Sequence, residues 1–147
     1  RSPLVAASGT VGSVVDFAKM RAYARESIEK YDIRTPSELT PAHALSGGNQ
    51  QKVIVAREMR FDPILLVASQ PTRGVDVGAT EFIYQQLVAA RSRGKAVLLV
   101  SADLDEILSL SDRIGVIFKG RIIREFRQEE ATKEQVGLCM TGEKRSA

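Results

Sequence analysis

The stretch that decides the fold is ALSGGNQQK at residues 44–52, which places a serine and two glycines directly before a run without helix breakers. The start of a helix has N–H groups without intrahelical acceptors and about half a positive charge, so it attracts anions such as phosphate. Gly47 and Gly48 carry no side chain that would hold a phosphate away, while Ser46 and Asn49 add a hydroxyl and an amide. A plain N-cap and a tight turn would explain SGG alone better, because such caps are common. The stretch as a whole predicts a phosphate-binding helix start.

The residues before this stretch contain helical patterns and no strand pattern. Small residues without periodicity predict a loop over residues 1–12. Over residues 13–32, apolar side chains recur every three or four positions and predict a helix. Its apolar stripe consists of Phe17, Met20, Ala24, Ile28 and Tyr31. A capping box then predicts a short turn, formed by Thr35, Pro36 and Glu38. The next helix is expected to run from Asn49 to the FDP sequence at 61–63.

Beyond residue 63, strand patterns alternate with helical ones. The apolar runs ILLVAS at 64–69 and KAVLLVSA at 95–102 predict two strands buried on both faces. Helices are expected at 78–94, 103–111 and 129–142, and a hairpin turning at Lys119-Gly120 is expected at 112–126. The helix at 78–94 has a stripe of Ile83, Leu87 and Ala90 and a stop at Gly94. Strands that alternate with helices predict an α/β fold with a parallel sheet.

The composition limits the classes of function. The chain has 147 residues, 44% of them apolar and 27% charged, which is typical of a soluble globular domain. The net charge of +3 is spread among acids and Trp is absent, so we expect no nucleic-acid partner. The single Cys139 excludes an internal disulfide and is expected to be a buried thiol. His43 has no nearby metal-ligand partner, so no metal site is expected. No signal peptide or membrane span is found, which favours a cytoplasmic location.

Three stretches resemble, in order, motifs of the ATP-binding-cassette (ABC) ATPases. LSGGNQQK resembles their signature motif in the form typical of sugar and nucleoside importers. PILLVASQPTRGVDVGA at 63–79 resembles the Walker B strand and D-loop, and residues 95–122 resemble the switch-histidine strand, its helix and the following hairpin. The resemblance covers about residues 20–142 and implies a partial P-loop NTPase (ABC ATPase) fold. It implies a helical subdomain with the signature helix over 1–61. Residues 62–147 would be the carboxy-terminal half of the RecA-like core, with half of a mainly parallel sheet and a terminal helix.

The sequence departs from this family at three catalytic positions. Ser69 and Gln70 stand where the family pattern has an aspartate and a glutamate, and Ala102 stands where it has the switch histidine. A neutral amide is no general base, and serine is a poor magnesium anchor. No G-x-x-x-x-G-K sequence occurs in the chain. These losses resemble the second, degenerate cassette of tandem importer ATPases, so this chain alone is expected to be inactive.

The resemblance implies that each nucleotide lies between two cassettes. The signature residues Ser46, Gly47, Gly48 and Asn49 would then serve the ATP of another cassette, which the resemblance places in the same natural chain. Asp76 matches the D-loop aspartate of the family, and the alternative is that it is simply an acid that stabilises a helix start. Arg73 would either contact the partner cassette or be an exposed turn residue. ATP and magnesium would bind in the complete assembly, neither tightly to this chain alone.

The resemblance also implies partners and a location. Transmembrane permease subunits are the expected partners, and a solute-binding protein is an indirect partner. The protein is expected in the cytoplasm, attached peripherally to the inner face of the cell membrane. Two alternatives stay open: a non-hydrolysing ABC-like interaction module, and a soluble non-transport ABC protein.

Overall fold

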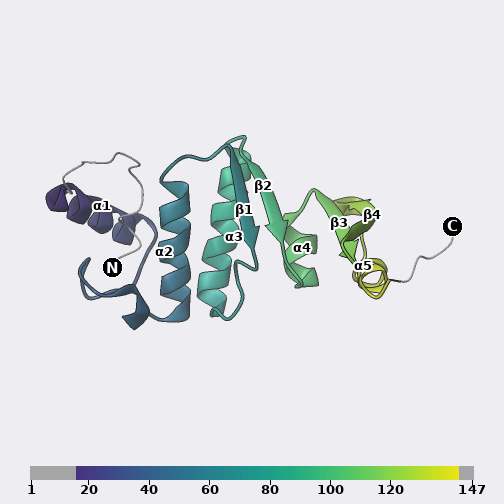
Figure 1. Cartoon of the computed structure of the whole chain (residues 1–147), viewed down its shortest axis with the longest axis horizontal. Coiled ribbons are helices and arrows are strands. Elements are labelled where there is room, and N and C mark those ends of the chain that lie inside the picture. Colours follow the sequence, from purple (N-terminus) through teal and green to yellow (C-terminus); the bar gives the residue numbers. More distant parts are fainter. Residues whose placement is uncertain (1–15, 143–147) are drawn as a thin grey trace. The chain divides into compact units, whose positions relative to one another are not determined.

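The computed structural model describes residues 16–142, in which helices and strands alternate from α2 to β3 (Figure 1). The chain divides into two compact units, one running up to Leu66 and including Thr72–Ala96, the other combining Val67–Pro71 with the chain from Val97 onward. The loop predicted for residues 1–12 and the start of the first helix at Ser13 lie outside the described residues. The division into a helical part and an ATPase core at residue 61 stays a prediction. Within residues 16–142, no helix combines the length and apolar character needed to cross a membrane.

The first helix, α1, spans Phe17–Lys30 and confirms the predicted helix. Asp16 caps its start, accepting a hydrogen bond from the Lys19 backbone N–H at 3.0 Å. The apolar stripe is only partly buried, because Phe17 is 68% exposed whereas Ala24 and Tyr31 lie in the interior. The helix therefore packs mainly through its carboxy-terminal half.

The capping box predicted from Thr35, Pro36 and Glu38 does not form, although a turn lies here, in which the Thr40 N–H donates to the Ser37 carbonyl at 3.2 Å. The Thr35 hydroxyl donates to the Ser37 carbonyl at 2.9 Å instead of accepting from the Glu38 N–H. Glu38 accepts two hydrogen bonds from the Arg25 guanidinium, and this contact lowers the pKa of the Glu38 carboxyl. The only helical turn in this connection is the 3₁₀ helix η2, which spans Ala42–Ala44.

Two long helices follow, and they confirm the sequence predictions. Helix α2 spans Gly47–Met59 and helix α3 spans Val77–Ser92, and the two pack side by side (Figure 1). The predicted stripe of Ile83, Leu87 and Ala90 is buried, with Ile83 fully enclosed. Gly94 follows α3 with a φ of +78°, a left-handed conformation that suits glycine at a helix end.

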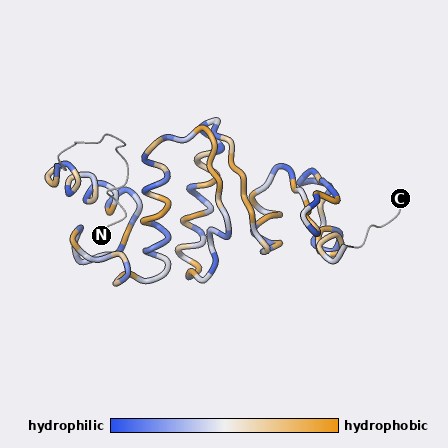
Figure 2. The backbone as a smooth tube through the Cα atoms, in the orientation of Figure 1, coloured by the Kyte–Doolittle hydropathy of each residue, from blue (hydrophilic) through white to orange (hydrophobic). Residues whose placement is uncertain are grey.

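Both predicted apolar strands form, but they are not buried on both faces. Strands β1 (Leu65–Ser69) and β2 (Ala96–Val100) pair in a two-stranded sheet. They run parallel, because hydrogen bonds join Ile64 to Ala96 at the starts of the strands and Gln70 to Val100 at their ends. Their apolar residues form continuous hydrophobic stretches (Figure 2). Alternate side chains are exposed, namely Leu65 at 54%, Val67 at 59%, Leu98 at 52% and Val100 at 45%.

The remaining elements confirm the predicted helix, hairpin and terminal helix. They are α4 (Leu104–Leu110), β3 (Arg113–Phe118), β4 (Arg121–Arg127), the 3₁₀ helix η3 (Gln128–Glu130) and α5 (Lys133–Met140). Strands β3 and β4 are antiparallel and turn at Lys119 and Gly120, with φ values of +47° and +76°, as a tight hairpin requires. The hairpin and α5 share a core that consists of Ile114, Val116, Phe126, Val136 and Cys139. The prediction that Cys139 is buried is therefore confirmed.

Candidate functional site

The signature residues lie at the start of α2. Ser46 is the N-cap, yet its hydroxyl makes no capping hydrogen bond. The Gln50 N–H donates to the Ser46 carbonyl at 2.9 Å, which closes the first turn. The N–H groups of Gly47, Gly48 and Asn49 precede this bond and have no intrahelical acceptor. This helix start can therefore offer both a hydroxyl and backbone N–H groups to an anion.

The two glycines have different surroundings. A Cβ added to Gly47 would lie 3.4 Å from the Gly74 carbonyl oxygen, which is ordinary contact. A Cβ added to Gly48 would lie 2.7 Å from Asp76 Oδ2 and 2.8 Å from Ala79 Cβ, and Gly48 is buried. Gly48 is therefore needed for the close packing of α2 on the start of α3, whereas Gly47 has room for a Cβ.

Asp76 caps α3. Its Oδ1 accepts a hydrogen bond from the Ala79 N–H at 2.9 Å. This is the helix-start role that the sequence offered as the alternative to a D-loop role. The same carboxylate approaches Gly48, so the structure brings the start of α2 and the start of α3 together.

Asn49 links the helix start to the connection that follows α1. Its Nδ2 lies 2.9 Å from Ser46 Oγ, and its Oδ1 lies 2.8 Å from the Arg34 backbone nitrogen. Gln50 is bonded separately, because its Nε2 donates to the Leu45 carbonyl at 2.8 Å. The Asn49 side chain therefore bridges Ser46 and a segment 15 residues away.

Lys52 provides a second link, which the sequence analysis did not identify. The residue is 8% exposed, and Nζ lies 2.8 Å from both the carbonyl oxygen and Oδ2 of Asp32. Nζ also lies 4.8 Å from the centroid of the Phe82 ring. The hydrogen bond and charge of Lys52 lower the pKa of the Asp32 carboxyl. The sequence did contain a signal that Lys52 is buried, because it lies four residues after Gly48 and thus on the same helix face.

This ion pair predicts a loss of stability in acid. The folded-state pKa of Asp32 lies below its unfolded value of about 3.9. The pair therefore stabilises the fold above that pH, and its contribution is lost as the pH falls through the folded pKa. Urea unfolding should show Asp32→Asn to be less stable than the parent at pH 7, with a difference that shrinks below about pH 4. A difference that stays constant down to pH 3 would contradict this assignment.

The three positions that depart from the family pattern all lie near the ends of β1 and β2. Ser69 ends β1, and Gln70 follows in a left-handed conformation with a φ of +49°. The Gln70 N–H donates to the Val100 carbonyl at 2.8 Å, which places it beside the end of β2, and Ala102 follows two residues later and is exposed. A hydroxyl or an amide oxygen is a weaker magnesium ligand than a carboxylate, and a methyl group is no ligand. Ser69, Gln70 and Ala102 therefore place no carboxylate and no imidazole at the ends of these strands.

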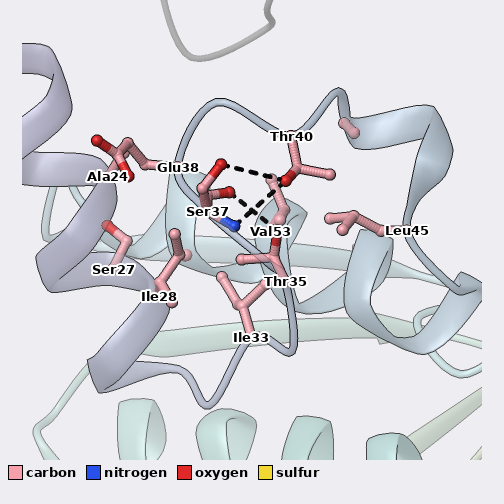
Figure 3. Close-up of a pocket in the computed structure, with 12 residues that line it drawn as sticks. Ala24, Ser27, Ile28, Ile33, Thr35, Ser37, Glu38, Thr40, Leu45 and Val53 are labelled. Carbon is pink, nitrogen blue, oxygen red and sulfur yellow. Dashed lines mark hydrogen bonds between the residues drawn. The ribbon is translucent and has the colours of Figure 1, made fainter.

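A separate cavity lies between α1, the connection after it and α2 (Figure 3). Its volume is about 70 Å³, and it is partly open to solvent. Apolar side chains form much of its lining, including Ile28, Ile33 and Val53, and hydroxyl groups of Ser37 and Thr40 lie in the connection beside it. The lining includes Leu45 but not the four signature residues. The candidate phosphate site is therefore an exposed helix start rather than an enclosed pocket.

The chain is similar to importer ATP-binding proteins. It matches no family model. It is 54% identical over 129 residues to the guanosine import ATP-binding protein NupO of Bacillus subtilis, covering 88% of this chain and 25% of that protein. It is 51% identical to the nucleoside import ATP-binding protein NupA of Lactococcus lactis (87% and 25%) and 45% identical to the xylose import ATP-binding protein XylG of Moorella thermoacetica (80% and 23%). The chain thus spans about a quarter of the length of these curated relatives.

Solved structures agree on the fold. A dimeric bacterial ABC transporter cassette superimposes with a TM-score of 0.66 at 26% identity, over 80% of this chain and 51% of the cassette. Another ATP-binding cassette of an ABC transporter gives a TM-score of 0.66 at 24% identity, over 89% and 50%. The chain is therefore homologous to a segment of the ATP-binding subunits of ABC importers for nucleosides and sugars, and it has a partial ABC ATPase fold.

Proposed function

We propose that the chain is part of the ATP-binding subunit of an importer for nucleosides or simple sugars, in which it completes the ATP site of another cassette. Ser46, Gly47 and Gly48 supply the helix start that faces the phosphates of that ATP. The chain's own catalytic positions, Ser69 and Gln70, supply neither a magnesium anchor nor a base. The chain alone is therefore inactive.

The observation that carries this function is that the start of α2 has polar groups without hydrogen-bond partners in the helix itself. The Ser46 hydroxyl does not cap its helix, and the N–H groups that follow lack intrahelical acceptors. An exposed helix start that faces an anion needs a second surface to enclose the ligand. Homology to importer ATP-binding proteins supports another cassette as the source of that surface.

The assembly implies further partners and cofactors. ATP binds with magnesium at the composite site, and the carboxylates that order the metal belong to the other cassette. The complete subunit works on permease subunits at the inner face of the membrane, and a solute-binding protein delivers the solute. Asp76 lies in the segment next to the signature and contacts the partner cassette, in addition to capping α3.

Adding the chain to a separately produced amino-terminal importer cassette tests this function. The parent chain should stimulate the ATPase rate of that cassette, and Gly47→Asp should reduce the stimulation by roughly tenfold or more, since a hydrogen bond to a charged group is worth about 1.5–3 kcal/mol. Gly47 is preferred to Gly48 because a side chain at 48 would also disturb the packing on Asp76 and Ala79.

Gly47→Ala is the matched control, because it adds the same Cβ without a charge. Sedimentation must show that each variant still associates with the cassette. Association without any stimulation by the parent chain would favour a non-hydrolysing interaction module. Equal stimulation by the parent chain and Gly47→Asp would exclude a phosphate contact at the signature.

A further inference from the structure

We propose that Asn49 is a positioning residue that makes the Ser46 hydroxyl a hydrogen-bond donor toward the phosphate. The direction of the Asn49 amide is set by the backbone N–H of Arg34. This inference rests on the proposed function of the signature loop. It also assigns a role to the connection after α1. This connection does not contact the ligand but acts on Ser46 through the Asn49 side chain.

The first step is the orientation of the Asn49 amide. The Arg34 backbone nitrogen lies 2.8 Å from the Asn49 side chain. A backbone N–H can only donate, so it must face the carbonyl oxygen Oδ1 and not the NH₂ group. The Asn49 amide therefore has one possible direction, and Nδ2 points to Ser46.

The second step is the direction of the Ser46 hydroxyl. Nδ2 of Asn49 lies 2.9 Å from Ser46 Oγ and can only donate. Ser46 Oγ therefore accepts this bond, and its own proton must point elsewhere. The hydroxyl makes no capping bond to its helix, so the proton is available to a phosphate oxygen.

The third step is the support of the connection that carries the Arg34 N–H. Asp32 has a φ of +47°, which is uncommon for a residue other than glycine. The buried Lys52 holds Asp32 through its carbonyl and its carboxylate, both at 2.8 Å. Ile33 is 6% exposed and packs in the core with Tyr31 and Ala56. The Arg34 N–H is therefore presented by a fixed segment.

Two substitutions at Asn49 distinguish positioning from a structural role. Asn49→Asp keeps an oxygen for the Arg34 N–H but places a second acceptor opposite Ser46, so the hydroxyl turns inward. Asn49→Ala removes both hydrogen bonds and leaves the hydroxyl free to rotate. Positioning predicts that ATPase stimulation falls in the order parent, Asn49→Ala, Asn49→Asp. A role in holding the connection predicts the opposite order for the two variants.

The experiment measures stimulation of the amino-terminal cassette together with the amide spectrum of the full chain. We expect Asn49→Asp to lose roughly 10- to 100-fold of the stimulation, the range for one hydrogen bond to a charged group. The Arg34 amide resonance should keep its hydrogen-bonded shift in Asn49→Asp and lose it in Asn49→Ala. The dispersion of the other amide resonances reports whether each variant is folded.

A double-mutant cycle with Ser46→Ala separates positioning from charge repulsion. In the Ser46→Ala background, Asn49→Asp should cause no further loss if it acts through the hydroxyl. An equal loss in both backgrounds would overturn the proposal, as would stimulation by Asn49→Asp at the parent level. Gln51→Glu adds the same charge to the same helix and should leave stimulation near the parent value.

Failure of the inference differs from failure of the proposed function. If Gly47→Asp and Ser46→Ala reduce stimulation while Asn49→Asp does not, only the positioning role is wrong. If neither Gly47→Asp nor Ser46→Ala has an effect, Ser46 meets no phosphate and both proposals fail.

Discussion

An Ile83→Ala variant is expected to lose about 2–5 kcal/mol of the free energy of unfolding. Ile83 is fully buried on α3, so truncation removes apolar contacts and leaves a cavity that the surrounding side chains fill only in part. Domains of this size have about 5–15 kcal/mol in total, so the loss is a large share of the stability. Urea unfolding followed by circular dichroism at 222 nm, a wavelength sensitive to helix, measures it.

Ile54→Ala is the matched control, because it makes the same chemical change at a residue on α2 that is 42% exposed. We expect it to cost less than about 1 kcal/mol. Similar losses for the two variants would mean that Ile83 does not lie in a close-packed interior.

A Leu98→Lys variant is expected to weaken self-association of the isolated chain by roughly tenfold or more. Strand β2 exposes Leu98 and Val100, and β1 exposes Val67. Exposed apolar strands with unpaired edges promote association, and burying one large apolar side chain is worth about 1.5–3 kcal/mol. A lysine at this position must instead lose its hydration on association. Sedimentation equilibrium across a range of protein concentrations measures the association constant.

Val88→Lys serves as the control for this surface. Val88 is 41% exposed but lies on α3, so it tests whether added charge alone changes association. A monomeric parent chain, or equal effects of the two lysines, would show that the exposed face of the strands does not drive association.

The sequence predicted the positions of the helices and strands better than the burial of their side chains. Helical periodicity identified α1 and α3, a run without helix breakers identified α2, and apolar runs identified β1 and β2. These signals are local, since side chains on one face of a helix or strand recur at fixed intervals. Burial of the strands on both faces was predicted wrongly, because burial depends on which other elements cover a sheet. Within residues 16–142, this sheet has only two strands.

The candidate site was predictable in part for the same reason. The stretch from Ser46 to Asn49 is contiguous and was recognised from its sequence. The bonds from Arg34 to Asn49 and from Lys52 to Asp32 join segments 15 and 20 residues apart, and no local pattern specifies them. The capping box failed for a related reason, because the Glu38 carboxylate accepts hydrogen bonds from Arg25, 13 residues away, rather than from a backbone N–H of its own turn.

The missing side chain of Gly48 has a mechanical consequence. There is no room for even a methyl group between this residue and the segment that contains Asp76 and Ala79. Close-packed surfaces transmit displacement rather than absorb it. Residues 46–49 and 74–79 are therefore expected to move as one body, so that a push on the turn before α3 displaces the start of α2 by a similar amount.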